Sequence, residues 1–187
     1  MSLLKTGILL VLGVVIVAAK SRYDVLVPDF EELAKNRTDK YFDGLDKKQR
    51  DLLVELVMAD EAKPTPKAVE ATQDPAVFKK AVRLSADLLL EHKVDRKLVE
   101  FIVEMLHQTN NNTQFADEDE QIQNELYVIG KILAKYDVLG EKEKKLADQI
   151  FPDYANAMYH VPQLREWSKA PEKHSIAYFR FKNQLQG

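Results

Sequence analysis

Three aspartates, Asp46, Asp74 and Asp95, each stand directly before a stretch in which apolar residues recur at helical spacing. An aspartate at this position caps a helix, because its carboxylate accepts hydrogen bonds from the first backbone N–H groups, which have no partner inside the helix. After Asp46, for example, Leu52 and Leu56 lie four residues apart and would share one helix face. The pattern therefore predicts amphipathic helices, and the small numbers of glycines (6) and prolines (7) agree with it.

Turn signals divide the chain into several helices. Pro64 and Pro66 interrupt the helix that follows Asp46, and the polar stretch TNNNTQ at residues 109–114 forms a predicted loop. The acidic run at residues 117–120 marks a helix start, because carboxylates in a first turn complement the helix dipole. The predicted helices begin after Asp29 and Asp46 and cover residues 76–91, 96–108, 117–136 and 141–150. Three later prolines limit the C-terminal region to short pieces: Pro152, Pro162 and Pro171.

Two of these segments resemble each other. DKKQRDLLVELVM (residues 46–58) and DRKLVEFIVEML (residues 95–106) share an aspartate cap, a basic pair and an apolar pattern, and a fainter echo follows Gly140. Periods of this size occur in stacked helical hairpins, although any two capped amphipathic helices share such features. The predicted fold class is therefore all-α: a single N-terminal transmembrane helix followed by an antiparallel helical bundle or a short stack of helical hairpins.

The N-terminal segment is the reason for predicting a transmembrane helix. Residues 7–19 carry no charge, and Lys5 and Lys20 flank them. Residues 3–19 would form a helix of about 26 Å, close to the ~30 Å hydrocarbon core of a bilayer, with both lysines reaching the interfaces. The predicted lipid-facing residues of this membrane anchor are Leu3, Ile8, Leu9, Leu10, Val11, Leu12, Val14, Val15, Ile16 and Val17.

The same segment has two other interpretations. In the first, it is the apolar core of a secretion signal, since its uncharged length fits and Ala18 and Ala19 are small enough for a cleavage site. In the second, it is a buried helix of a soluble protein. Lys20 and Arg22 on the C-terminal side favour a cytoplasmic domain by the positive-inside rule, whereas a cleavable start favours the opposite side. We therefore predict a single-pass membrane protein, and we leave open on which side of the membrane its helical domain lies.

The predicted domain layout has four parts. Residues 1–20 are the anchor or signal peptide, residues 21–29 a connector, residues 30–158 a helical domain and residues 159–187 an aromatic and basic C-terminal segment. From residue 160 onward this last segment carries five basic and two acidic side chains, in a chain whose net charge is −3.

The C-terminal segment has two predicted roles. It packs over the helices with its aromatic rings in the core, or it docks on another protein, since aromatic and arginine side chains dominate many interfaces. The predicted partner-binding residues are Trp167, Tyr178, Phe179, Arg180 and Phe181. The acidic net charge disfavours nucleic acid as a partner.

One stripe could hold a metal ion. Glu104 and His107 are three residues apart, which is half of the pattern that carboxylate-bridged di-iron bundles use, and Glu100 lies on the same stripe. The chain has no second Glu-x-x-His sequence and no cysteine. Arg96 can pair with Glu100 at i,i+4, so a solvated charged face is the simpler interpretation. No cofactor is predicted.

These patterns predict a non-catalytic, membrane-anchored structural, accessory or assembly subunit of a membrane-bound complex. Its predicted partners are membrane lipid, through the N-terminal helix, and other protein subunits. One alternative is a secreted or periplasmic helical binding protein with a cleaved signal peptide. The other is a metal-dependent helical-bundle enzyme that uses Glu100, Glu104 and His107.

Overall fold

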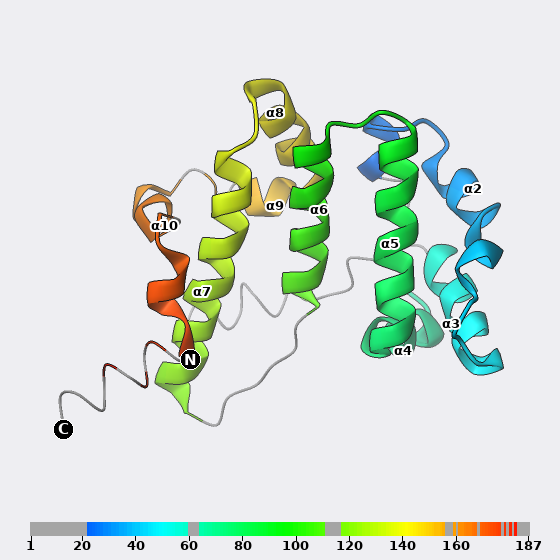
Figure 1. Ribbon diagram of the computed structural model, residues 1–187, viewed down its shortest axis with the longest axis horizontal. Helices are drawn as coiled ribbons and strands as arrows, with labels where there is room; N and C mark the ends of the chain where they lie inside the picture. Colours follow the sequence, from blue (N-terminus) through cyan, green and yellow to red (C-terminus); the bar gives the residue numbers. More distant parts are fainter. Residues whose placement is uncertain are drawn as a thin grey trace. The chain divides into compact units, whose positions relative to one another are not determined.

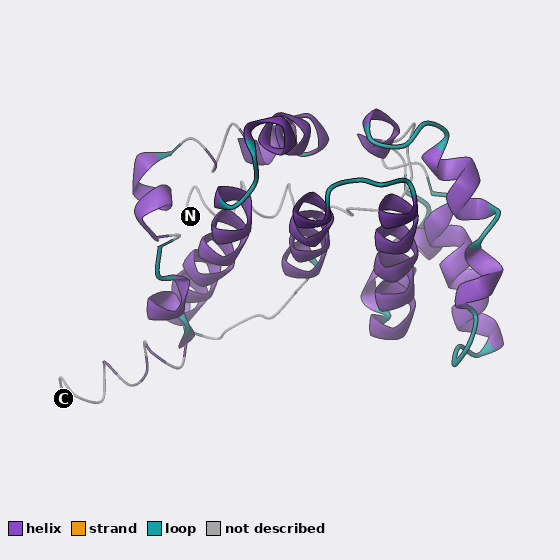
Figure 2. Cartoon of the chain, turned by 45° about the horizontal axis from the view of Figure 1, so that its top comes forward, coloured by secondary structure: helices purple, strands orange, loops and turns teal. Residues whose placement is uncertain are grey.

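The structure is a computed structural model that describes residues 22–59, 64–110, 117–155, 159, 161–167, 169–176, 178, 180 and 182. Within these residues the regular structure is entirely helical (Figure 2), so the predicted all-α fold is confirmed. The predicted membrane anchor at residues 3–19 lies outside the described residues. None of the described helices combines the length and the apolar character that crossing a bilayer requires.

The chain forms two compact units, Met1–Asn110 and Asn111–Gly187. In the sequence, the division between them falls within the polar stretch that is predicted as a loop. The boundary predicted between residues 158 and 159 falls inside the second unit.

In the first unit, α5 is the central helix (Figure 1). Helices α2, α3, α4 and α6 and the short helix η2 all contact it. The elements of this unit are η1 (Arg22–Val25), α2 (Phe30–Lys35), η2 (Thr38–Tyr41), α3 (Lys47–Val57), α4 (Pro66–Gln73), α5 (Pro75–Glu91) and α6 (Arg96–Thr109).

Two adjacent apolar stripes explain why α5 is central. Val77, Ala81, Leu84 and Leu88 form the first stripe at four- and three-residue intervals, and all four are buried. The second stripe is offset by one residue and is buried as well; it consists of Phe78, Val82, Ser85 and Leu89. Together the stripes cover a wide arc of the helix, so α5 can bury side chains against several neighbours at once.

The predicted aspartate caps are confirmed. Asp46 accepts a hydrogen bond from the Gln49 backbone N–H (2.8 Å), and the Gln49 side chain accepts one from the Asp46 N–H (3.1 Å). Asp74 accepts from the backbone N–H groups of the second and third residues of α5, and Asp95 does the same for α6. Because each cap satisfies donors that the helix leaves unpaired, these three aspartates fix where α3, α5 and α6 begin.

Helix α4 is not among the predicted helices, because the two prolines near residue 65 indicate a break. In the structure Pro66 is the first residue of α4. The backbone N–H at this position has no partner within a helix, so proline, which has no N–H, loses no hydrogen bond there. Thr65 caps this helix by accepting a hydrogen bond from the Ala68 N–H at 3.1 Å. The pair Thr65–Pro66 is therefore a start signal.

The predicted connector at residues 21–29 is also part of the folded unit. It contains η1, and it buries the side chains of Tyr23 and Val27. The Tyr23 ring lies 5.1 Å from the Phe30 ring of α2, centroid to centroid.

The second unit contains α7 (Glu118–Asp137), α8 (Glu141–Ile150), α9 (Pro152–Tyr154), α10 (Pro162–Trp167) and η4 (Pro171–His174). Helices α10 and η4 both contact α7, and α9 contacts α8. Asp117 caps α7 by accepting from the Glu120 N–H (2.9 Å), so the acidic run begins this helix as predicted. The elements α9, α10 and η4 each start at one of the three C-terminal prolines, which confirms the predicted interruptions.

Replacing Leu53 with alanine should destabilise the first unit by about 2–5 kcal/mol, because the side chain is fully buried in α3 and its loss leaves a cavity. The matched control is Val54→Ala. Val54 is the next residue of the same helix, its side chain is 43% exposed, and its removal should cost about 0.5 kcal/mol or less. Urea unfolding followed by circular dichroism measures both. Equal losses would contradict the packing of α3.

Lys93→Gly should stabilise the protein by up to about 1 kcal/mol. Lys93 follows α5 with a φ of 62°, a left-handed conformation that strains any residue with a Cβ atom. The Val94 N–H donates to the Leu89 carbonyl (3.0 Å) across this turn, so the turn itself is well formed. The same substitution at Lys79, an exposed position within α5, should instead cost about 1 kcal/mol. Thermal unfolding of the two variants should therefore shift in opposite directions.

Candidate functional site

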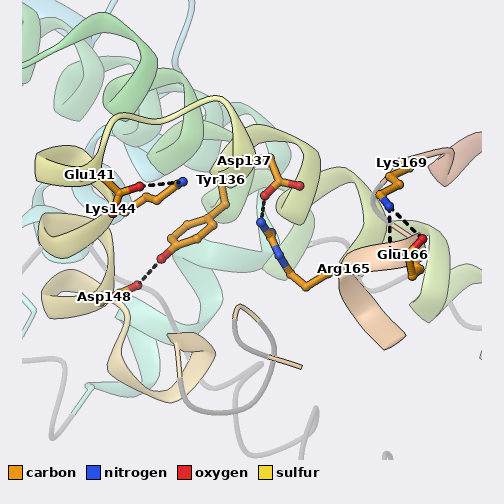
Figure 3. A network of polar contacts seen from close by, with 8 residues as sticks. All are labelled: Tyr136, Asp137, Glu141, Lys144, Asp148, Arg165, Glu166 and Lys169. Atoms are coloured by element: carbon orange, nitrogen blue, oxygen red, sulfur yellow. Dashed lines mark hydrogen bonds and ion pairs between the residues drawn. The ribbon is translucent and has the colours of Figure 1, made fainter. Parts of the chain in front are cut away.

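The most organised group of polar and aromatic side chains surrounds Tyr136, near the end of α7 (Figure 3). Its hydroxyl donates a hydrogen bond to Oδ1 of Asp148 in α8, at 2.9 Å. The two rings of Tyr136 and Tyr159 stack with centroids 4.2 Å apart and planes 21° apart. Both tyrosines are buried, at 3% and 1% exposure. The Tyr136 side chain therefore connects α7 to α8 through its hydroxyl and to residue 159 through its ring.

Two cations also approach the Tyr136 ring. Lys144 Nζ of α8 lies 6.0 Å from the ring centroid, and Arg165 Cζ of α10 lies 5.7 Å from it. Arg165 forms an ion pair with Asp137, the residue after Tyr136, and Lys144 lies 3.3 Å from Glu141 (Figure 3). A cation over an aromatic ring contributes about 0.5–2 kcal/mol. Three helices thus meet at one ring through contacts that hold their positions.

The electrostatics of this group favour a fixed charge state. Burial raises the pKa of Tyr136, and the hydrogen bond to Asp148 raises it further. Burial likewise raises the pKa of Tyr159. In the first unit, burial and the hydrogen bond to Asp87 raise the pKa of Tyr41 to about 12. These three tyrosines stay neutral at physiological pH.

In the described residues, hydrogen bonds and ion pairs also shift the pKa values of charged groups, and each group keeps its ordinary charge. The hydrogen bond to Glu70 raises the pKa of Lys48, and the one from Arg37 lowers the pKa of Glu91. Partial burial acts to raise the pKa of Asp74, but hydrogen bonds from Gln49 and the α5 backbone outweigh it and lower the pKa. Each of these shifts stabilises the ordinary charged form of the side chain, because its partner carries the opposite charge or donates hydrogen bonds to it.

Glu100, Glu104 and His107, the stripe considered as a metal site and interpreted as a solvated face, lie on α6, and each has a different neighbour. Glu100 pairs with Arg96 (3.5 Å), as the i,i+4 spacing predicts. Glu104 accepts a hydrogen bond from the Gln108 amide (2.6 Å), and the His107 ring lies edge-on to Phe78, 6.2 Å between centroids. Within the described ranges no group of three or more His, Asp or Glu side chains is placed to hold a metal ion. The stripe therefore offers no ligand set in this part of the chain.

The predicted partner-binding residues are described only in part. Phe179 and Phe181 lie outside the described residues, and so does the side chain of Trp167, which ends α10. Tyr178 is 44% exposed, and its backbone N–H donates to the Ser175 hydroxyl (3.2 Å). Arg180 reaches back to Glu120 in the first turn of α7. Their role in binding a partner stays a prediction.

The positive charge of the C-terminal segment is largely matched within the second unit. Arg165 pairs with Asp137, and Lys169 with Glu166 at 2.7 Å (Figure 3). Arg180 pairs with Glu120, so three of the five basic side chains of this segment face a carboxylate. A diffuse basic surface is therefore a poor description of this segment, and individual contacts matter more.

The sequence patterns do not single out Tyr136 and its neighbours. One signal was available: Ile129, Leu133 and Tyr136 occupy a single apolar stripe of α7, and a buried tyrosine hydroxyl needs a hydrogen-bond partner. The sequence does not show which residue supplies that partner, because Asp148 lies on another helix.

Comparison of the chain with models of known protein families, with curated proteins and with solved structures gives no significant match. The function therefore has to be inferred from the residues of this chain.

In alkaline solution, at least three of the seven tyrosines should resist ionisation at about pH 11, since burial raises the pKa of Tyr41, Tyr136 and Tyr159. Their pKa values are higher in the folded state than the value of about 10 in the unfolded chain. Their contribution to stability is therefore complete below about pH 10 and is lost as the pH rises through the folded pKa values.

Absorbance titration at the phenolate band, with and without denaturant, measures this difference. Tyr41→Phe should remove one of the late-titrating groups. A single native transition of all seven tyrosines near pH 10 would contradict the buried hydrogen bonds of Tyr41 and Tyr136.

Proposed function

We propose that this chain is a non-catalytic, membrane-anchored accessory or assembly subunit of a membrane-bound complex, and that its C-terminal segment binds another protein subunit. The polar contacts of the described residues support the non-catalytic part. Lys48 pairs with Glu70, Asp74 caps α5 and Tyr41 donates a hydrogen bond to Asp87, and each of these contacts stabilises the fold.

The uncharged run at residues 7–19, flanked by Lys5 and Lys20, supports a membrane anchor. The distance between this run and the folded domain is small, because Tyr23 is fully buried only four residues after Ala19. Four extended residues span at most about 14 Å. Under this proposal the first unit is held close to the bilayer, as suits a subunit that works beside membrane-embedded partners.

Tyr178 supports binding to another protein. This aromatic side chain is 44% exposed, next in the chain to a segment that contacts α7. Tyrosine and arginine are enriched among the residues that contribute most to protein interfaces.

The first test measures the intact mass of the protein from its native membrane fraction, together with the proteins that co-purify in mild detergent. The expected result is a full-length mass and partner proteins in fixed stoichiometry. Deletion of residues 176–187 should abolish the co-purification of these partners. A soluble protein about nineteen residues shorter, without a partner, would contradict the proposal and favour the binding protein with a cleaved signal.

A charge placed within the anchor tests the membrane part separately. Leu12→Arg should move the protein out of the membrane fraction, since an arginine at the centre of a span costs about 3 kcal/mol. Ser2→Arg introduces the same side chain outside the uncharged run and should have no effect. Membrane fractionation after carbonate extraction measures both variants, and equal behaviour would count against an anchor at residues 3–19.

A further inference from the structure

One end of the first unit brings together two segments that are far apart in the chain. The short connection of residues 92–95 joins α5 to α6, and these two helices pack against each other. The end of α5 and the start of α6 therefore lie at the same end of the unit. Figures 1 and 2 both show η1 beside this end of α5. We call η1 together with residues 90–97 the η1 end.

Two apolar side chains of the η1 end face the solvent. Val25, the last residue of η1, is 47% exposed, and Leu90, in the last turn of α5, is 43% exposed. Tyr23 and Leu89, in the same two elements, are buried instead. Val25 and Leu90 thus lie outside the core of the unit, and a lipid interface would remove their apolar area from water.

The same end carries exposed cations. Lys93, which follows α5, and Arg96 and Lys97, in the first turn of α6, all have exposed side chains. Arg96 pairs with Glu100 at 3.5 Å, whereas no carboxylate in the described part of the chain pairs with Lys93 or Lys97. Two lysines of the η1 end are therefore available to an external anion.

The carboxylates of the η1 end are engaged within the fold. Asp24 Oδ1 accepts a hydrogen bond from the Phe30 backbone N–H at 3.1 Å, and Asp95 caps α6. Glu91 forms an ion pair with Arg37. These contacts hold the negative charges of this end in fixed positions and leave the positive charge of the two lysines to attract a partner.

The chain that precedes η1 indicates what that partner is. Residues 7–19 are the uncharged run of the proposed anchor, and Tyr23 of η1 is fully buried only four residues after Ala19. Four residues span at most about 14 Å, so an anchored chain holds its η1 end at the bilayer surface. Lysines attract the anionic phospholipids of such a surface, and exposed apolar side chains insert among the headgroups.

We propose that the η1 end docks on the headgroups of anionic phospholipids, with Lys93 and Lys97 at the lipid phosphates and Val25 and Leu90 within the interface. The first unit then stands on the bilayer, and α5 leads away from it. The inference rests on the proposed function, because the anchor is what brings the η1 end to the membrane.

Fluorophores at the two ends of α5 test this orientation in the full-length chain, which has no cysteine of its own. His92→Cys lies in the η1 end and Ala76→Cys in the first turn of α5, and both positions are exposed. About 24 Å separates them along the helix axis. Each labelled variant is reconstituted in vesicles of phosphatidylcholine and phosphatidylserine that contain a phospholipid with a quencher on its headgroup.

The quencher should reduce the fluorescence at residue 92 about twofold more than at residue 76, which lies roughly a helix length from the bilayer. Quenching at residue 92 should also fall as salt is added, because salt screens the attraction between the lysines and the lipid. Equal quenching at the two positions would overturn the proposal.

Removing the two lysines tests their role. Lys93→Gln combined with Lys97→Gln should lower the quenching at residue 92 about twofold or more. The matched control combines Lys67→Gln and Lys79→Gln, which removes two exposed lysines near the starts of α4 and α5 and should leave the quenching unchanged. Equal losses in the two double variants would mean that only net charge matters and would overturn the proposal.

Carbonate extraction of the same vesicles separates this inference from the proposed function. A chain that leaves the vesicles has no anchor, so both proposals fail. A chain that stays in the vesicles with residue 92 unquenched keeps its anchor, and only the docking of the η1 end is overturned. Shielding of residue 92 that needs partner subunits and not lipid would also overturn it and assign this end to a protein.

Discussion

The arrangement of α3, α4 and α5 depends on the carboxylate of Asp74. This residue ends α4 and caps α5, and the Gln49 side chain of α3 donates to it at 3.1 Å. Gln49 also completes the cap of its own helix with Asp46. One helix end, that of α4, and two helix starts, those of α3 and α5, thus meet at these capping side chains. The ion pair between Lys48 and Glu70 (2.6 Å) joins α3 to α4 beside them.

The second unit relies on an aromatic ring in a comparable way. Tyr136 is the meeting point of a hydroxyl–carboxylate hydrogen bond, a stacked ring and two cations, which come from α8, residue 159 and α10. Elements as short as α9 and α10 have little helical stability of their own, because helix formation needs several turns to offset nucleation. Arg165, which lies over this buried ring and pairs with Asp137, gives α10 a defined position, and α9 packs against α8.

Features that depend on neighbours in sequence were predictable. The caps at Asp46, Asp74 and Asp95 and the starts at the C-terminal prolines rest on backbone groups within three residues. Helix α4 differs from the prediction because proline, which breaks a helix in its interior, is favourable at the first helical position, where Pro66 lies. Glu104 and His107 share one face of α6, as their spacing indicates, but spacing alone does not show which residues lie opposite that face.

The contacts around Tyr136 and between Arg180 and Glu120 were not predictable from one sequence. They join residues 12 and 60 positions apart, and many other carboxylates could have been the partner. Packing of the apolar stripes decides which helices become neighbours, and only then does the chemistry of a particular pair follow. The candidate site was therefore found from the structure, whereas the helices that carry it were predicted from the sequence.

The burial of Tyr23 against Phe30 has a mechanical consequence. The two rings lie 5.1 Å apart, and they join η1 to α2. A force that enters the first unit from its N-terminal side acts on η1 and so on this aromatic pair. Such tension would load the contact between η1 and α2 before it loads the longer helices of the unit.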